Sequence, residues 1–432
     1  MKKTLIFVAA VAAFAGALLV NSCKKDDVAT IPIVKVEVVL PDGFSATATY
    51  SGAVTMTDKT TGKVLTANAE ASVATFKNVP YGSYSVAASA IMANADFKAA
   101  APEISASVTA DIALNSTPVD VVLAKDDEAA EPIKVTVIWS VPSSLVISRI
   151  YNFGTQNLAG KAYNIDKYIE IYNTSAETVY ADGLYLGEAY GSVVTASPYT
   201  NVATANVCYM QRVVRIPGTG NQYPIEPGKS IVIAQNAKNH IDAEVITNTV
   251  DLSGADFECY VTGAPASMFP ADNAEVPNIE EIFGATSSQA KFFAGQGTIP
   301  VLFRMEASAF EALETETAPG YEAYPQYAPN CKKLPVSAIL DAVDGVRIGY
   351  EARKGSHVPA SVDAGNAPIN QKNITLRKIA YFAADGRAVL QDTNNSSADF
   401  VIVESTDGTI LVPRKYDVAQ IQPAAEAQVA AE

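Results

Sequence analysis

The chain has 432 residues, and 31 Lys or Arg against 46 Asp or Glu give it a formal net charge of −15. This acidity excludes nucleic acid as an expected partner, because phosphate binding depends on clustered Lys and Arg. Hydrophobic residues make up 49% and charged residues 18%, so most of the chain can bury a core and is not a disordered polyampholyte. The length predicts about two or three domains.

An export signal occupies residues 1–22. Lys2 and Lys3 precede an uncharged run from Thr4 to Val20, and small polar residues separate this run from Cys23. The pattern predicts a secretory signal peptide. The alternative is a membrane-spanning anchor helix, which the run would fit only at the short limit of about 17 residues.

The stretch Val20-Asn21-Ser22-Cys23 resembles a lipobox, in which a dedicated peptidase cleaves before a diacylglyceryl cysteine. The resemblance implies lipid attachment at Cys23. The next residues, Lys24-Lys25-Asp26-Asp27, resemble the charged tether of Bacteroides-type lipoproteins, and we place this tether at residues 23–32. It implies an outer-membrane protein that is anchored by lipid and faces the cell exterior.

Short alternating strands are expected in residues 33–124. Val34, Val36 and Val38 would face one side of the first strand, while Lys35 and Glu37 would face the other. This all-β pattern is typical of a sandwich. The stretch from Thr75 to Val86, TFKNVPYGSYSV, resembles the end of a carboxypeptidase-regulatory-like (prealbumin-like) sandwich, whose members are usually spacers or docking platforms.

A charged linker at residues 125–134 separates this domain from a second β domain, which we predict at residues 135–415. Tight hairpins are expected in the second domain at Asp-Gly pairs, and the clearest is the last. These pairs are Asp182-Gly183, Asp344-Gly345, Asp385-Gly386 and Asp407-Gly408. Residues 416–432 form a low-complexity tail of Ala, Gln and Glu, which we expect to be disordered or a frayed helix.

The second domain resembles a lamin-tail-like domain, an immunoglobulin-type sandwich. The resemblance rests on LVISRIY, DKYIEIYN, YADGLYL, PGKSIVIA and DTNNSSADF, which begin at Leu145, Asp166, Tyr180, Pro227 and Asp392. Residues 238–334 have no counterpart and are interpreted as an insertion. The whole arrangement is similar to an uncharacterised Bacteroides lipoprotein family, domain of unknown function 4876. The fold expected is therefore all-β, with two tandem sandwiches.

Strand residues 168–173 contain two polar side chains that invite a functional interpretation. Ile169 and Ile171 should point into the core, and Tyr168, Glu170 and Tyr172 should face outward. Glu170 and the following Asn173 could belong to a site, but hydrogen bonds that tie loops together are the favoured role.

The oxygen-bearing residues near the end of the second domain could hold calcium. Asp392, Asn394, Ser396 and Asp399 alternate along one loop, but the loop lacks the glycine and the terminal Glu of an EF-hand. A loop-capping role is favoured for them.

Recognisable catalytic and metal motifs are missing from the sequence. The only histidines are His240 and His357, and there is no HExxH, GxSxG or CxxC pattern. Pro227-Gly228-Lys229-Ser230 ends like a Walker loop, but an apolar strand should follow it instead of a helix. We therefore expect no catalytic residues, no metal site and no cofactor, and both histidines are interpreted as ordinary loop residues.

Cysteines and tyrosines leave alternatives open. Cys208, Cys259 and Cys331 could form at most one disulfide, or could all be buried apolar residues. Tyrosines crowd one stretch of the second domain, where they could fill the ends of the sandwich or contact a partner. They are Tyr151, Tyr163, Tyr168, Tyr172, Tyr180, Tyr185, Tyr190, Tyr199, Tyr209 and Tyr223.

These features favour a non-catalytic cell-surface lipoprotein that binds an outer-membrane partner or an extracellular polymer, either protein or polysaccharide, through loops and the insertion. One alternative is a hydrolase of surface glycan that uses two carboxylates, with its site in residues 238–334. Another is a purely structural spacer.

Lipidation can be tested directly. We expect Cys23→Ala to abolish palmitate labelling and to release the protein into soluble fractions, because the acyl chains would be its only membrane anchor. Metabolic labelling with palmitate followed by cell fractionation measures both effects. Persistent labelling of the variant would contradict the assignment.

Overall fold

The structure is a computed structural model. It describes residues 29–416 apart from 62, 107, 109–110, 117, 126–130, 141–142, 196, 198, 200, 261–265, 268, 285–296, 321–328, 352–354 and 384. The signal peptide, Cys23 and the tail after residue 416 lie outside the described residues. Strands hold 45% of the described residues and helices 9%, so the predicted all-β class is confirmed.

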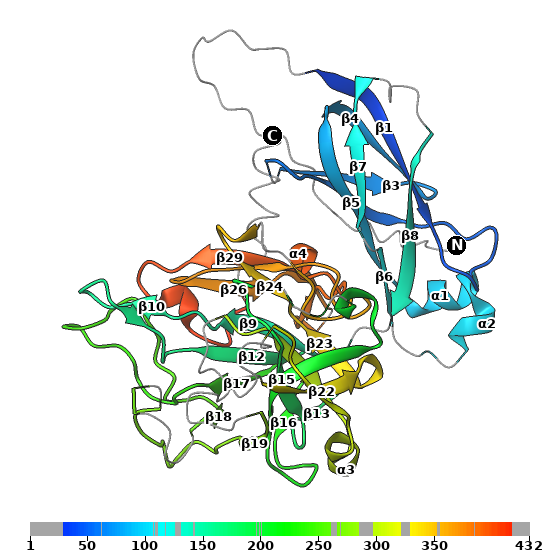
Figure 1. Ribbon diagram of the computed structural model, residues 1–432. Coiled ribbons are helices and arrows are strands. Elements are labelled where there is room, and N and C mark those ends of the chain that lie inside the picture. Colours follow the sequence, from blue (N-terminus) through cyan, green and yellow to red (C-terminus); the bar gives the residue numbers. More distant parts are fainter. Residues whose placement is uncertain are drawn as a thin grey trace, which may run out of the picture. The chain divides into compact units, whose positions relative to one another are not determined.

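The described chain forms two compact units, which meet in the sequence between residues 142 and 143. Unit 1 covers the described residues up to 140, and unit 2 covers those from 143 to 416 (Figure 1). Within the described ranges, no helix has both the length and the apolar character needed to cross a bilayer.

Unit 1 is a sandwich whose strands follow the order β3-β2-β5-β6-β8-β1-β4, with β7 paired to β5. Its core forms as the sequence predicts, because Val34, Val36 and Val38 are buried while Lys35 is exposed. The elements are β1 (Thr30–Val39), β2 (Gly52–Asp58), β3 (Val64–Ala69), β4 (Val73–Pro80), β5 (Gly82–Met92), α1 (Asn94–Ala100), α2 (Pro102–Ser105), β6 (Ile112–Ser116), β7 (Val119–Leu123) and β8 (Ile133–Ser140).

The boundary between the units differs from the predicted one. We expected residue 135 to open the second domain, but β8 pairs in parallel with β1 and then antiparallel with β6. It joins unit 1 because Val135 and Val137 are fully buried in the core of that unit. The expected tether also ends earlier than residue 32, since β1 already begins at Thr30.

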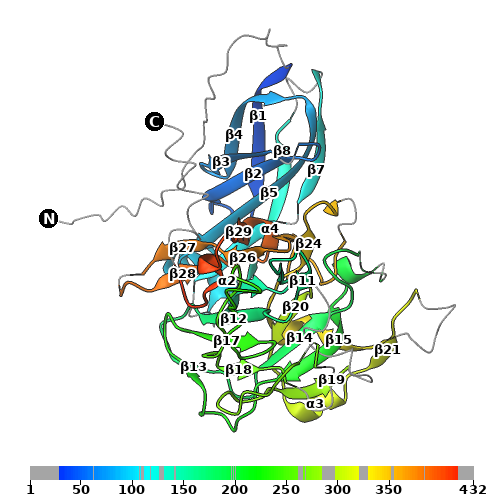
Figure 2. The ribbon, with the colours of Figure 1, turned by 90° about the vertical axis from the view of Figure 1, so that its left-hand side faces the viewer.

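Unit 2 contains two large sheets. The first, sheet C, has the order β18-β17-β12-β9-β26-β29 (Figure 2), and the second, sheet F, has the order β21-β22-β15-β14-β20-β23 with β19 paired to β15. The strands of sheet C are β9 (Leu145–Tyr151), β12 (Tyr168–Asn173), β17 (Ser230–Ala234), β18 (Phe257–Glu258), β26 (Asn373–Arg377) and β29 (Phe400–Glu404). Those of sheet F are β14 (Tyr185–Ala189), β15 (Val207–Arg215), β19 (Glu280–Phe283), β20 (Pro300–Phe303), β21 (Thr315–Thr317), β22 (Asn330–Pro335) and β23 (Ile339–Ala342).

Smaller elements complete unit 2. Four two-stranded ribbons join β10 to β11, β13 to β16, β24 to β25 and β27 to β28. Their bounds are β10 (Thr155–Gln156), β11 (Ala162–Tyr163), β13 (Val179–Tyr180), β16 (Pro224–Ile225), β24 (Gly345–Arg347), β25 (Ala367–Ile369), β27 (Ile379–Phe382) and β28 (Ala388–Leu390). The helices are η2 (Val202–Thr204), α3 (Ala307–Glu311), η4 (Val336–Ala338), α4 (Ser396–Asp399) and η6 (Thr409–Leu411).

The segment predicted as an insertion, residues 238–334, is part of the sandwich. It supplies β20, which lies between β14 and β23 in sheet F. Val301, Leu302 and Phe303 are fully buried there. The segment is therefore needed for the core of unit 2.

Both faces of β12 are buried, which corrects the expectation of a half-buried strand. Ile169 and Ile171 pack into the core between the sheets, as predicted. Tyr168 on the opposite face is also fully buried, in a second cluster that includes Leu252 and Leu411. Loops that pack over sheet C thus replace solvent on its outer face.

Only one of the expected Asp-Gly hairpins joins paired strands. Asp385-Gly386 links β27 to β28, which are antiparallel. Asp407-Gly408, the clearest signal in the sequence, leads instead into η6. The reason is packing, because a Cβ at residue 408 would lie 2.1 Å from the carbonyl oxygen of Thr249. The chain here is held against a neighbouring loop and does not turn back on β29.

A buried ion pair lies on the outer face of sheet C. Arg149 Nε is 3.4 Å from Glu170 Oε2, and both side chains are fully buried. The Ser230 hydroxyl donates to Glu170 at 2.6 Å, and the backbone N–H of Arg414 donates to it at 2.9 Å. The Tyr416 hydroxyl also donates to Glu170.

We call residues 409–416 the strap, because this segment covers the ion pair. Its carbonyl groups at Ile410 and Leu411 accept hydrogen bonds from Arg149 at 3.3 Å and from the Tyr168 hydroxyl at 2.5 Å. Residue 416, where we expected a loose tail to begin, is part of this packing, since the Tyr416 hydroxyl donates to Glu170.

Removal of one partner of this pair should destabilise unit 2. We expect Glu170→Gln to lower the free energy of unfolding by about 3 kcal/mol, because Arg149 would keep its charge in a buried site without a counterion. Urea unfolding measures the change, and Glu177→Gln at an exposed position is the control. Equal unfolding free energies for the two variants would contradict the expectation. Adding Arg149→Met to Glu170→Gln should recover part of the loss.

Candidate functional site

The outer loop, residues 236–256, folds back on itself over sheet C and is held by isolated β-bridges between Asn239 and Asp251 and between Asp242 and Ile246. The backbone N–H of His240 donates to the carbonyl of Val250 at 3.2 Å, and that of Leu252 donates to Lys238 at 2.9 Å. Leu252 is buried against the outer face of sheet C. The base of the outer loop is therefore an ordered part of the fold.

His240 fastens the middle of the outer loop. Its Nδ1 accepts a hydrogen bond from the Tyr163 hydroxyl at 2.8 Å, and its Nε2 donates to the carbonyl of Asn236 at 3.1 Å. Burial lowers the pKa of His240 to about 4. The ring is neutral at pH 7 and acts as a structural clamp, which is the loop role expected from the sequence.

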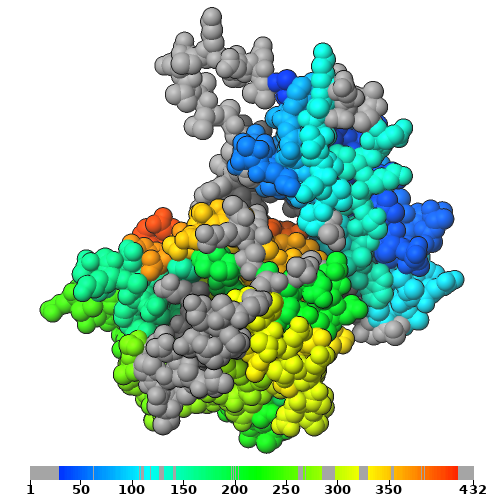
Figure 3. All heavy atoms as spheres, in the orientation of Figure 1, coloured from blue at the N-terminus to red at the C-terminus, as the bar shows by residue number. Residues whose placement is uncertain are grey.

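Three exposed apolar side chains stand at the end of the outer loop. Leu158 is 61% exposed, Ile241 is 50% exposed and Val245 is 46% exposed. The backbone N–H of Leu158 donates to the carbonyl of Val245 at 2.9 Å, so the turn after β10 lies beside the loop (Figure 1). We call these three residues the apolar tip. Figure 3 shows this end of unit 2 as a projection at the left of the view.

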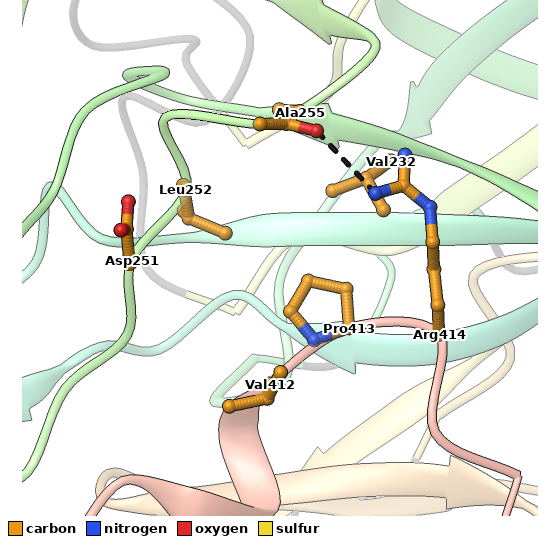
Figure 4. A pocket seen from close by; sticks show the side chains of 8 residues that line it. Val232, Asp251, Leu252, Ala255, Val412, Pro413 and Arg414 are labelled. Carbon is orange, nitrogen blue, oxygen red and sulfur yellow. Dashed lines mark hydrogen bonds between the residues drawn. The ribbon is translucent and has the colours of Figure 1, made fainter.

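A pocket of about 160 Å³ lies at the base of the outer loop (Figure 4). The strap forms one wall and the loop forms another. The pocket is lined by Val232, Asp251, Leu252, Gly254, Ala255, Val412, Pro413 and Arg414. Its surface is mostly apolar, with one carboxylate and one guanidinium.

The two charged groups of the pocket differ in their partners. Arg414 forms an ion pair with Asp256 and donates to the carbonyl of Gly254 at 3.3 Å. Asp251 accepts two hydrogen bonds from Ser253, at 2.9 Å from its N–H and at 2.6 Å from its hydroxyl. Arg414 is therefore matched by an acid, whereas Asp251 forms no ion pair within the described ranges.

Glu170 and Asn173, the polar residues singled out in the sequence, tie loops together. Glu170 holds the strap, as described above. The side-chain amide of Asn173 donates to the carbonyls of Glu177 and Ile225, each at 2.7 Å. The loop-tying role that the sequence favoured for both residues is the one they have in the structure.

The loop considered for calcium is bound to a buried arginine. Arg377 is within 2.5 Å of Asp341, 3.1 Å of Asp392 and 3.7 Å of Asp399. Burial raises the pKa of Asp341 above its ordinary value, although Arg377 opposes this effect. Asp399 also accepts from the N–H of Thr393 at 2.8 Å, so it caps the loop. Across the part of the chain that the structure describes, no three His, Cys, Asp or Glu residues are placed to hold a metal ion.

His357 is also buried, but its pKa shifts in the direction opposite to that of His240. Its Nδ1 lies 2.7 Å from Asp344 and its Nε2 lies 2.6 Å from the carbonyl of Thr195. Burial lowers the pKa of His357, but the hydrogen bond and charge of Asp344 outweigh burial, and the net direction is upward. The pKa of His357 is thus raised, and its ring links two loops.

Most of the crowded tyrosines fill the core of unit 2. Tyr185 stacks on Phe303 with the ring centroids 4.9 Å apart, and Tyr199 stacks on Tyr209 at 3.5 Å. Tyr180 is the exposed exception, at 40%. Packing, one of the two interpretations left open by the sequence, therefore accounts for most of them.

The three cysteines of the second domain are free and buried. Burial raises the pKa of the Cys331 thiol to about 12 and raises that of Cys208 further. Both thiols stay protonated and act as apolar core residues.

The pocket and the apolar tip were not found by sequence reasoning. Ile241 and Val245 are apolar residues in a polar stretch of the sequence, and this difference was the one sequence signal for the apolar tip. The pocket joins Val232, Leu252 and Val412, which are far apart in the chain, and no local pattern brings them together.

Comparison with known proteins finds a family model that matches part of the chain. Residues 226–406 match the model described as a protein of unknown function, DUF4876. The resemblance expected from the sequence is confirmed, and the DUF4876 region contains the whole outer loop but not Arg414. The family description assigns no activity.

One solved structure supports the fold. A crystal structure of a DUF4876 family protein from Bacteroides thetaiotaomicron is 22% identical and has a TM-score of 0.51, and the match covers 87% of this chain and 95% of that chain. A candidate adhesin from Bacteroides ovatus is 10% identical, with 82% of this chain and 99% of that chain covered, but its TM-score of 0.19 does not establish a shared fold. No curated protein matches the sequence.

The neutral clamp at His240 predicts a loss of stability in acid. The pKa of His240 is about 4 in the folded protein and near 6.5 when unfolded, so below pH 6.5 the unfolded chain binds the proton first. This contribution is intact above pH 6.5 and is lost as the pH falls toward 4. Between pH 7.5 and pH 5 it should cost about 2 kcal/mol.

Urea unfolding at these two pH values measures the effect. The matched variant is His240→Gln, whose amide can donate to Asn236 and accept from Tyr163 without titrating. The wild-type protein should lose about 2 kcal/mol more than this variant. Equal losses in the two proteins would show that His240 is not held neutral.

Proposed function

We propose that this protein is a non-catalytic, lipid-anchored protein of the bacterial cell surface, which binds an outer-membrane partner or an extracellular polymer through the outer loop of unit 2. The observation that supports the proposal best is the apolar tip. Ile241 and Val245 on the outer loop and Leu158 on the adjacent turn expose apolar surface, and the outer loop is held in place by His240 and Leu252. Apolar surface presented in this way is typical of interaction sites.

The roles of the polar residues favour binding over hydrolysis. His240 and His357 each use both ring nitrogens in structural hydrogen bonds. Glu258, an acid in the segment considered for a glycan hydrolase, accepts backbone N–H groups of Ala237 at 2.9 Å and Asn273 at 2.6 Å. These groups hold loops in place, which supports a scaffold for recognition.

The place of the protein at the cell surface rests on the sequence. The signal peptide and the lipobox resemblance at Cys23 supply the export route and the anchor, and the charged tether follows them. The full sequence has a net charge of −15, and an anchored chain without Lys2 and Lys3 would be more acidic still, so it would remain well solvated beside an anionic membrane. In this proposal unit 1 is the spacer between the lipid and the binding unit.

Charged substitutions at the apolar tip should abolish partner capture. We expect the double variant Leu158→Asp, Val245→Asp to lower recovery of cross-linked partners from intact cells by about tenfold or more, since interface anchors each contribute about 1 to 2 kcal/mol. Quantitative mass spectrometry after cross-linking and purification measures the loss.

Ile348→Asp is the matched control, because Ile348 is 45% exposed in the same unit and lies outside the apolar tip. It should leave recovery unchanged. Unchanged recovery with the double variant would contradict binding through the tip. Recovery of no partner above a tether-only protein would contradict a binding function altogether.

A further inference from the structure

We propose that the pocket at the base of the outer loop receives the side chain of a lysine, so that the partner is a protein with a basic segment at this point. This inference rests on the proposed function and names the chemistry of the partner. It follows from the size, the charge and the rigidity of the pocket.

The size of the pocket suits one long side chain. A volume of about 160 Å³ is comparable to the roughly 150 Å³ cavity that can hold a benzene-sized group. Val412 and Pro413 supply the exposed apolar surface of the lining, over the buried side chains of Val232 and Leu252 (Figure 4). The four methylenes of a lysine would lie against these residues and leave the ammonium at the mouth.

The charge of the pocket favours a cation. Arg414 is matched by Asp256, whereas Asp251 accepts hydrogen bonds from Ser253 and has no ion pair within the described ranges. The lining therefore carries one uncompensated carboxylate. An anionic ligand would meet a guanidinium whose charge is already matched by Asp256, but an ammonium can bind Asp251 without breaking an ion pair. The net charge of −15 also attracts a basic partner over longer distances.

The walls of the pocket are already in place. Asp251 pairs with Asn239 across the outer loop, and its side chain is fixed by Ser253. On the opposite wall, the backbone N–H of Arg414 is bound to Glu170. A ligand would order few new groups on binding, which lowers the entropic cost of the complex.

Two small molecules of equal chain length test the charge preference on the full protein. The first is n-butylammonium, which reproduces the lysine side chain, and the second is n-pentanoate, which carries a carboxylate on the same four carbons. Methyl NMR titration follows the signals of Val232, Leu252 and Val412. Saturable shifts of these signals with n-butylammonium, and weaker or absent shifts with n-pentanoate, are expected.

Variants connect the effect to the pocket. Asp251→Asn should weaken n-butylammonium binding by up to about fivefold, as expected for an exposed ion pair. Glu244→Gln, at an exposed acid of the same loop outside the pocket lining, should leave it unchanged. Stronger binding of n-pentanoate than of n-butylammonium would overturn the proposal in favour of an anionic ligand. An absence of saturable shifts with either compound would overturn it as well.

A second arm distinguishes a protein lysine from a free amine. Purified protein carrying a photo-activated cross-linker is added to cells whose surface lysines have been acetylated, and to untreated cells. Acetylation removes the ammonium, so partner capture should fall severalfold. Unchanged capture would overturn the lysine assignment while leaving binding through the apolar tip intact. If the double variant Leu158→Asp, Val245→Asp loses partner capture but keeps normal shifts with n-butylammonium, the apolar tip and the pocket act separately.

Discussion

The pairing of Glu170 with Arg149 under the strap is the constraint on which the outer face of unit 2 depends. Two opposite charges at 0% exposure must compensate each other, because an unmatched charge in the interior is costly. Glu170 also binds Ser230 from β17 and the backbone of Arg414 from the strap. The end of the described chain is thereby fixed across the middle of sheet C.

This constraint also determines what the candidate site can be. The strap supplies Val412, Pro413 and Arg414 to the pocket, and the outer loop supplies the facing wall. Arg414 connects the two, since its backbone binds Glu170 and its guanidinium binds Asp256. The apolar tip therefore projects from a rigid base. A surface held in this way can recognise a partner without first becoming ordered, which suits a protein proposed to act by binding.

The sequence was sufficient for the parts of the fold that local patterns control. Alternation at Val34, Val36 and Val38 indicated the first strand, and the DUF4876 resemblance indicated the second unit. The sequence was not sufficient where segments that are distant in the chain determine the local structure. Tyr168 alternates like a solvent-facing residue, but Leu411 and its neighbours, more than two hundred positions later, cover it. Asp407-Gly408 has hairpin composition, but contact with Thr249 overrides it.

The same distinction explains the candidate site. Polar residues that local motifs highlight, such as Glu170, Asn173 and Asp399, all hold the fold together. The features proposed to bind a partner are formed by tertiary packing between the strap, the outer loop and the turn after β10. No periodicity or motif in the sequence indicates that these segments pack together. In this protein, the polar residues that local motifs highlight therefore have structural roles.

Hydrogen exchange followed by mass spectrometry tests the central claim most directly, by comparing the wild-type protein with Glu170→Gln. If the buried pair fixes the strap and the base of the outer loop, residues 249–256 and 405–416 should exchange faster in the variant. Exchange in β14 and β20 of sheet F should stay the same. Unchanged protection of residues 249–256 in a folded Glu170→Gln protein would contradict the account, because the site would then be held by something other than this ion pair.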